Sequence, residues 1–168
     1  MRLVLFIFIF VLVSNAAQAS SQPESLGENG AWSGYTFTEN KQKVCYLTGA
    51  PKASEGDYTK RGDVFLFITH YPQSNVFDDL YFDMGYPLKK GAEGTVSVEK
   101  TSFSVIGDKN HLFSADRKQD KKIINALKQG DTLVVKSVSQ KGTKTTDTFD
   151  LKGFVKTYQA ISKACKKP

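Results

Sequence analysis

The residue types that most often serve as thiol nucleophiles, metal ligands or bases near neutral pH, cysteine and histidine, are few in this chain and far apart in the sequence. The 168 residues include two cysteines, Cys45 and Cys165, and two histidines, His70 and His111. A thiol nucleophile needs a base beside it, and no local signature around either cysteine supplies one. Two distant histidines make a weak metal site, because most sites need three or four converging ligands. We therefore expect no metal and no cofactor.

The pair Cys45 and Cys165 is predicted to form a disulfide. An even number of cysteines in an exported chain favours a bridge, and the N-terminal residues described below indicate export. The bridge would close a long loop, which is worth about 4–5 kcal/mol in the chain-entropy model. Two free buried thiols, or a thiol nucleophile, are the alternatives.

Asp147 is a further residue whose position suggests a chemical or structural role. In the expected strand 145–151 it shares a face with Phe149 and Leu151, and a bare buried carboxylate costs several kcal/mol. It must therefore be paired or capping, and we expect it to bind backbone N–H groups of the nearby turn; a catalytic role is the alternative. His70 ends the apolar strand 64–71 and is expected to be partly buried and hydrogen-bonded.

Motif support for an enzyme is absent. The chain has no Gly-x-Ser-x-Gly, no His-Glu-x-x-His and no Cys-x-x-Cys, which are the usual local signatures of hydrolases, metalloproteases and thiol oxidoreductases. We therefore predict a protein that is not an enzyme. If it were one, His70, His111 and Asp147 would have to converge in a pocket.

One surface motif deserves separate mention. Arg61-Gly62-Asp63 ends the loop-like stretch 49–62 and leads directly into a strand. The same tripeptide is recognised by integrins when a loop tip exposes it, and exposed loops often carry function. An adhesive role is thus one hypothesis, and a turn that starts a strand is the other.

The N-terminus indicates export. Arg2 precedes the apolar run 3–13, and Ala17-Gln18-Ala19 has the small-x-small pattern of a signal-peptide cleavage site. We therefore predict a signal peptide over 1–19, cleavage after Ala19, a flexible polar leader over 20–31, and a single domain over 32–168 in the periplasm or outside the cell. No later stretch is apolar enough to cross a membrane.

The charge pattern argues against nucleic acid as a partner. The formal net charge is +6, and +5 without Arg2. The lysines are scattered as pairs, whereas nucleic-acid binders cluster them on one face or interleave them with aromatic residues. Weak attraction to an anionic envelope or host-cell surface remains open.

The apolar pattern predicts a mainly β fold. We expect about eight short antiparallel strands in a sandwich-like domain, a middle helix over 117–129, and a C-terminal helix packed on the sheet. In that last helix Phe154, Tyr158, Ile161 and Cys165 fall on one face. Strand 64–71 is apolar on both faces, which predicts a central strand that is covered on both sides.

Several of these residues resemble the invasion-associated locus B family. The resemblance is carried by Trp32, Cys45-Tyr46, Gly85-Tyr86-Pro87 and, above all, Gly142-Thr143 and the segment Thr146–Phe154 with Cys165. It implies an exported protein of Gram-negative alphaproteobacteria, some of whose relatives are associated with host-cell invasion. The family often has an Ala-Trp pair before the middle helix, where this chain has Phe113-Ser114-Ala115. The resemblance implies no catalytic residues.

Two classes of function follow. The first is an exported, non-enzymatic protein that acts through its surface on a protein or cell-surface partner, in invasion, virulence or envelope maintenance. The second is a periplasmic small-ligand carrier or an uncharacterised hydrolase. A carrier or hydrolase should bring His70, His111 or Asp147 together in a concave pocket, whereas a surface-acting protein should keep them apart and expose an apolar or basic patch.

Overall fold

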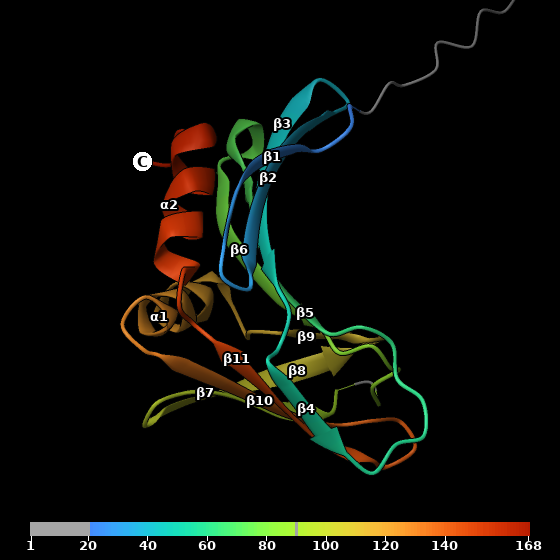
Figure 1. Ribbon diagram of the computed structural model, residues 1–168. Coiled ribbons are helices and arrows are strands. Elements are labelled where there is room, and N and C mark those ends of the chain that lie inside the picture. Colours follow the sequence, from blue (N-terminus) through green and yellow to red (C-terminus); the bar gives the residue numbers. More distant parts are fainter. Residues whose placement is uncertain (1–20, 90) are drawn as a thin grey trace, which may run out of the picture.

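The computed structural model describes residues 21–89 and 91–168, in which eleven strands form one antiparallel sheet, accompanied by two α-helices and a short 3-10 turn (Figure 1). The predicted signal peptide lies outside the described residues. The elements in chain order are β1 (Glu24–Asn29), β2 (Trp32–Glu39), β3 (Gln42–Gly49), β4 (Ala53–Gly56), β5 (Phe65–Tyr71), η1 (Pro72–Ser74), β6 (Val76–Asp83), β7 (Glu93–Val98), β8 (Thr101–Asp108), β9 (His111–Phe113), α1 (Arg117–Leu127), β10 (Thr132–Val138), β11 (Lys144–Asp150) and α2 (Phe154–Ala164).

The sheet is open but folded back on itself. Its strand order is β1-β2-β3-β5-β6-β9-β8-β7-β10-β11-β4, so β3 lies near one end and its successor in the chain, β4, at the other. In Figure 1 the strands around β2 and those around β10 form two parts that meet at an angle. This confirms the predicted mainly β, sandwich-like class with two helices, although the structure has more strands than the eight expected.

Two of the additional strands lie where the sequence suggests irregular chain. β1 falls within the predicted flexible leader 20–31, and that prediction is wrong for these residues. It pairs with β2 from Glu24 opposite Thr36 to Asn29 opposite Trp32, and Leu26 packs against the core. β4 falls in the predicted loop and pairs with β11. Both strands are mostly exposed and polar. Backbone pairing holds them in place, and such pairing leaves no apolar pattern in the sequence.

Trp32 joins the two parts of the sheet to α2. Its ring is fully buried, lies 5.0 Å from the ring of Phe154 in α2 and 6.3 Å from that of Phe149 in β11, and its Nε1–H donates to the carbonyl of Asp150 at 2.9 Å. Gly153 starts α2 with φ +94°, and a Cβ there would lie 2.1 Å from the Asn29 carbonyl oxygen. Glycine therefore lets α2 begin directly against β1.

The helices form where the sequence predicts them. Asp116 caps α1 by accepting the Gln119 N–H at 2.8 Å, and the Gln119 side chain accepts the Ala115 N–H at 2.9 Å, as in a capping box displaced by one residue. The predicted stripe of α2 is buried: Phe154, Tyr158, Ile161 and Cys165 are at most 6% exposed. α2 packs on β1, β2 and β3, and α1 on β6 and β7.

Candidate functional site

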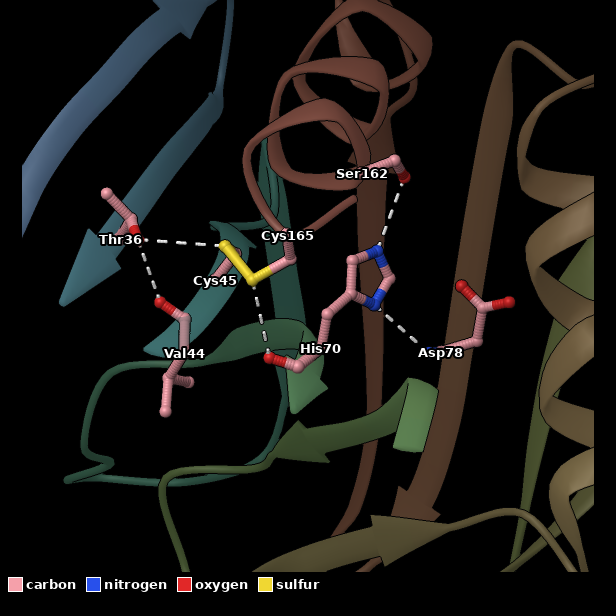
Figure 2. The surroundings of a disulfide bond; sticks show 7 residues. All are labelled: Thr36, Val44, Cys45, His70, Asp78, Ser162 and Cys165. Carbon is pink, nitrogen blue, oxygen red and sulfur yellow. Dashed lines mark hydrogen bonds between the residues drawn. A yellow bond between two sulfur atoms is a disulfide. The ribbon is translucent and has the colours of Figure 1, made fainter. Parts of the chain in front are cut away.

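The predicted disulfide joins the end of α2 to β3 (Figure 2). The Cα atoms of Cys45 and Cys165 are 6.0 Å apart, and both residues are buried. Thr36 donates its hydroxyl to the Val44 carbonyl at 3.1 Å and lies 3.6 Å from the Cys45 sulfur. The bridge is thus enclosed by β2, β3 and α2, and it holds the helix on the sheet.

His70 lies beside the bridge and is fully buried. Its Nδ1 accepts the backbone N–H of Asp78 at 3.1 Å, and its Nε2 lies 3.3 Å from the Ser162 hydroxyl. An Nδ1 that accepts a hydrogen bond carries no proton, so the neutral ring protonated at Nε2 fits this site. Burial lowers the pKa of His70 to about 4, although the Asp78 carboxylate acts against it. The sequence predicts a partly buried, hydrogen-bonded His70; here it has hydrogen-bond partners and is completely buried.

Asp78 extends this cluster to the C-terminus. It has a positive φ of 63°, its carboxylate accepts the Tyr158 hydroxyl at 2.6 Å, and it pairs with Lys167. Lys128, at the end of α1, lies 3.9 Å from the Tyr158 ring centroid. Burial works against the charge of Asp78, but hydrogen bonds from Lys167 and Tyr158 outweigh it and lower the Asp78 pKa. Every charged group here has a partner, so the cluster is structural in character.

Asp147 has a different partner from the expected one. Its two carboxylate oxygens each accept a hydrogen bond from Arg61 at 2.8 Å, in the bidentate geometry of a strong ion pair. Arg61 also donates its Nε–H to the Met84 carbonyl at 2.8 Å. Asp147 is therefore paired, as burial requires, but with a residue 86 positions away rather than with the neighbouring turn.

The Arg61–Asp147 ion pair argues against the hypothesis that Arg61-Gly62-Asp63 binds a cell-surface receptor. The Arg61 side chain is 4% exposed, and its guanidinium lies over the rings of Tyr86 and Tyr58, 4.7 and 5.5 Å from their centroids. Gly62 and Asp63 are exposed, but a receptor that reads all three residues would first have to remove Arg61 from a buried carboxylate. Arg61 therefore anchors its loop.

A groove lies beside this anchored loop. It encloses about 560 Å³ and is lined mainly by the loop 57–62, by Gly85-Tyr86-Pro87 and by the turn between β10 and β11. The Tyr86 hydroxyl lies 2.6 Å from those of Ser137 and Thr145. Gly85, with φ +68°, comes so close to the loop that a Cβ would lie 2.3 Å from the Gly62 carbonyl oxygen. Its volume exceeds those of two other hollows of the described residues, which enclose about 350 and 310 Å³.

His111 lies in a third environment, on the outer face of the sheet, which is the face opposite to the two helices. Its Nε2 lies 3.8 Å from the Asp83 carboxylate, and its ring meets that of Tyr81 edge-on at 5.2 Å. His70, His111 and Asp147 thus have separate sets of partners. The structure does not bring them together in one pocket, and within residues 21–89 and 91–168 no three His, Cys, Asp or Glu side chains are placed to hold a metal ion.

The outer face carries a continuous row of aromatic rings, which we call the aromatic platform. It crosses five adjacent strands, β2, β3, β5, β6 and β9, and neighbouring ring centroids are 4.9 to 6.4 Å apart. Its members are Tyr35, Phe37, Tyr46, Phe65, Phe67, Tyr81, His111 and Phe113. Both helices lie on the other side of the sheet (Figure 1): α2 packs against the face of Gly34, opposite to that of Tyr35.

The platform is partly solvent-accessible. Its rings are half-buried by one another, Phe113 is 39% exposed, and neighbouring Ile106 on β8 is 48% exposed. The prediction that strand 64–71 is covered on both sides is thus wrong for the side of Phe65 and Phe67. A shallow hollow of about 310 Å³ lies between Tyr46, Phe67 and Tyr81.

Sequence reasoning overlooked this surface, although it left a signal. Along β2, Tyr35 and Phe37 alternate with positions that share the buried face of Trp32. Along β5, Phe65 and Phe67 alternate with Leu66 and Ile68. Alternation of aromatic with aliphatic residues reads as burial on both faces, because periodicity does not say which face a helix covers. Aromatic residues at the outward positions of several strands were the available hint.

The residues behind the family resemblance divide between two of these places. Trp32, Phe154 and Cys165 form the core beneath α2, whereas Tyr86 and Thr143 line the groove. No helix of the described residues is long and apolar enough to span a membrane. Comparisons with curated proteins and with solved structures returned no match. A family model described as Invasion associated locus B (IalB) protein matches residues 32–162. Because this match covers most of the sequence, from Trp32 through Phe154 and including Tyr86 and Thr143, the chain belongs to the invasion-associated locus B family.

Proposed function

We propose that this chain is an exported, non-enzymatic protein that binds a partner protein through the aromatic platform, in the bacterial envelope or at a host-cell surface. Export is supported by the apolar run 3–13 before Ala17-Gln18-Ala19 and by the buried disulfide, a feature typical of oxidising compartments. Membership of the family supports a role in the envelope or in invasion.

The observation that carries this proposal is the aromatic platform itself. Large exposed apolar patches on monomeric proteins commonly mark interaction sites, and aromatic residues are enriched in protein interfaces. Here eight rings lie on one face of five strands, and neither of the two helices in the described residues packs over them. Of the three residues that could serve an enzyme, His70 and Asp147 have buried partners away from this face, and His111 is one of its rings.

Site-specific photocrosslinking in the native cell envelope, with and without host cells, tests the proposal. A photoreactive amino acid replaces Phe113 on the platform or, as a matched control, Val155 on α2, since these residues are 39% and 38% exposed. We expect a defined crosslinked protein from position 113 and none from position 155. Equal products from both positions, or abundant periplasmic chaperones alone, would contradict a partner-binding role for the platform.

Export is tested separately on the purified native protein. N-terminal sequencing of the periplasmic or secreted fraction should begin at Ser20, the residue after the predicted cleavage site. A chain that retains Met1 and sediments with membranes would contradict export by cleavage.

A second candidate function, small-ligand binding, is favoured by the groove beside Tyr86. Its volume of about 560 Å³ is within the usual range for ligand sites, and Lys60 and Lys141 line it with hydroxyl groups and the Tyr86 ring. A screen of anionic metabolites by thermal shift, with Lys60→Met/Lys141→Met as the control variant, tests this role. A compound that raises the melting temperature only of the unmodified protein would support it.

A further inference from the structure

We infer that the aromatic platform binds a basic protein segment, one that presents lysine or arginine side chains from an extended backbone. This inference rests on the proposed function and specifies the chemistry of its partner. It follows from the charges that surround the rings, from the way this protein already uses its own cations, and from the spacing of the rings.

The charges on the outer face are all of one sign on the strands that carry the platform. Residues paired directly across neighbouring strands point to the same face, which places Asp83 beside Phe65 and His111, and Asp79 beside Thr69. Further carboxylates on this face are Glu39, two residues from Phe37, and Asp108, opposite His111.

Cations border this face but do not cover it. β2, β3, β5, β6, β8 and β9 contain one lysine and no arginine, and that lysine, Lys43, alternates with Val44 and so points to the opposite face. Lys41 and Lys109 stand in turns at strand ends, and Arg117 interacts with Asp79 from the start of α1. For a chain with a net charge of +6, this segregation makes the platform complementary to a basic partner.

Two tyrosines of this face have raised pKa values: Tyr81 of the platform, and Tyr71, which lines the hollow beside it. Burial raises the pKa of Tyr81, and the nearby Tyr71, Asp83 and Asp79 raise it further. Burial likewise raises the pKa of Tyr71, with Asp79 and Glu39 adding to the effect. A cation placed among these groups would relieve the repulsion, while a second anion would increase it.

Aromatic faces attract cations, and this protein shows the interaction in two places within its own fold. The Arg61 guanidinium lies 4.7 Å from the Tyr86 centroid, and the Lys128 ammonium 3.9 Å from that of Tyr158. In both places a carboxylate stands close by, Asp147 and Asp78 respectively. The platform offers the same combination of ring and carboxylate, in Tyr81 with Asp83 and Asp79, without a cation of its own on the strands.

The spacing of the rings suits an extended chain. Successive side chains on one side of a strand are roughly 7 Å apart, and the ring centroids along the platform are 4.9 to 6.4 Å apart. Several lysine or arginine side chains of one extended segment can therefore each meet a ring or a bordering carboxylate. Each such contact is weak at an exposed site, so several are needed for stable binding.

The test uses the processed full-length chain and three fluorescent peptides of equal length, in which threonine alternates with arginine, glutamine or glutamate. Fluorescence anisotropy should show binding of the arginine peptide, weakened by added salt because exposed charges are screened, and at least about tenfold weaker binding of the other two. Equal binding of the three peptides would overturn the inference.

Amino-acid substitutions test whether the arginine peptide binds at the platform. Asp79→Asn/Asp83→Asn and Tyr81→Leu should each weaken binding of the arginine peptide about five- to tenfold, whereas Tyr81→Phe, which keeps the ring, should retain it. The matched control Glu55→Gln/Asp131→Asn removes two exposed carboxylates, on β4 and directly before β10, away from the platform, and should change nothing. Loss of binding in the control alone, or no loss in the platform variants, would contradict the inference.

Two other outcomes would also overturn it. Self-association in sedimentation velocity that Tyr81→Leu abolishes would make a second copy of the chain the occupant. Binding of a neutral oligosaccharide, unaffected by Asp79→Asn/Asp83→Asn, would make the rings a sugar-stacking surface. A crosslinked partner at position 113 together with no peptide binding would reject the basic-segment inference while retaining the proposed function; no crosslink at position 113 would reject the proposed function itself.

Discussion

The two faces of the strands β2, β3, β5 and β6 are both apolar, but they are built in different ways. The inner face carries Leu47, Leu66, Ile68 and Phe82, none of them solvent-exposed, beneath the helices and the disulfide. The outer face carries rings that pack against one another and stay only partly buried. Aliphatic side chains lose their hydration when a second layer packs on them, whereas tyrosine and histidine keep a polar group in water and tolerate an open face. The inner face therefore maintains the fold, and the outer face remains available for a partner.

The largest effect should come from the covalent link on the inner face. Cys45→Ala/Cys165→Ala should lower the free energy of unfolding by about 4 kcal/mol, because the bridge restrains a long loop in the unfolded chain. Urea unfolding followed by circular dichroism measures it. Reduction of the unmodified protein should shift the midpoint similarly, and an unchanged midpoint in both experiments would contradict the account of how α2 is held.

Truncation of one ring on each face compares the faces directly. Phe82→Ala should cost about 4 kcal/mol, since it opens a cavity in a fully buried site. Phe67→Ala, on the adjacent strand but the outer face, should cost about 1 kcal/mol, because the Phe67 ring is only half-buried and its loss removes less surface from water-free contact. Equal losses in chemical denaturation would show that the outer face is part of the core.

Removal of a charged side chain should also cost more stability on the buried side than on the outer face. Arg61→Met leaves Asp147 buried without a partner and should cost about 3–4 kcal/mol, while Arg61→Met/Asp147→Leu should recover most of that loss. Asp83→Asn, on the outer face, should be nearly neutral. Thermal unfolding of these three variants and the unmodified protein tests whether the Arg61–Asp147 pair stabilises the fold. An Arg61→Met variant as stable as the unmodified protein would contradict that role.

Acid stability tests the buried titratable groups of the inner side. Burial holds the pKa of His70 at about 4 against 6.5, so the unfolded chain binds more protons there and stability is lost as pH falls from about 6.5 to 4. Burial raises the pKa of Asp120 to about 6 from 3.8, so the folded chain binds more protons there and stability is regained between about pH 6 and 3.8. The two effects oppose each other in the unmodified protein.

Removal of one group should therefore reveal the other. Asp120→Asn should lose up to about 3 kcal/mol of stability from pH 6.5 to 4, and His70→Asn should become relatively more stable as pH falls from 6 to 3.8. Stability curves with pH, measured by urea unfolding, give both slopes. Parallel curves for the two variants would show that His70 and Asp120 do not have these opposite shifts.

The smallest effect concerns the tripeptide Arg61-Gly62-Asp63. Because the Arg61 side chain is locked against Asp147, Asp63→Glu should leave adhesion of host cells to immobilised protein unchanged. Loss of adhesion in this variant would restore the receptor hypothesis, with Glu55→Gln as a control for an exposed carboxylate on β4, outside the tripeptide.

Much of the fold could be predicted from local patterns. The hairpin of β2 and β3, the capped start of α1 at Asp116, the buried stripe of α2 and the pairing of Cys45 with Cys165 all follow from periodicity, capping chemistry and cysteine count. β1 and β4 were not predictable in this way, because their side chains are polar and their stability comes from backbone pairing with β2 and β11.

The functional surfaces depended on contacts across the chain. That Asp147 needs a partner follows from its place on an apolar face, but Arg61 as that partner is set by the way β11 and the loop 57–63 are brought together, 86 residues apart in sequence. Likewise, alternation in Phe65–Tyr71 determines that the strand has two apolar faces, whereas the packing of α2 and α1 decides which of them is covered. Sequence periodicity records the direction of each side chain relative to its own strand; only the tertiary structure records what lies opposite it.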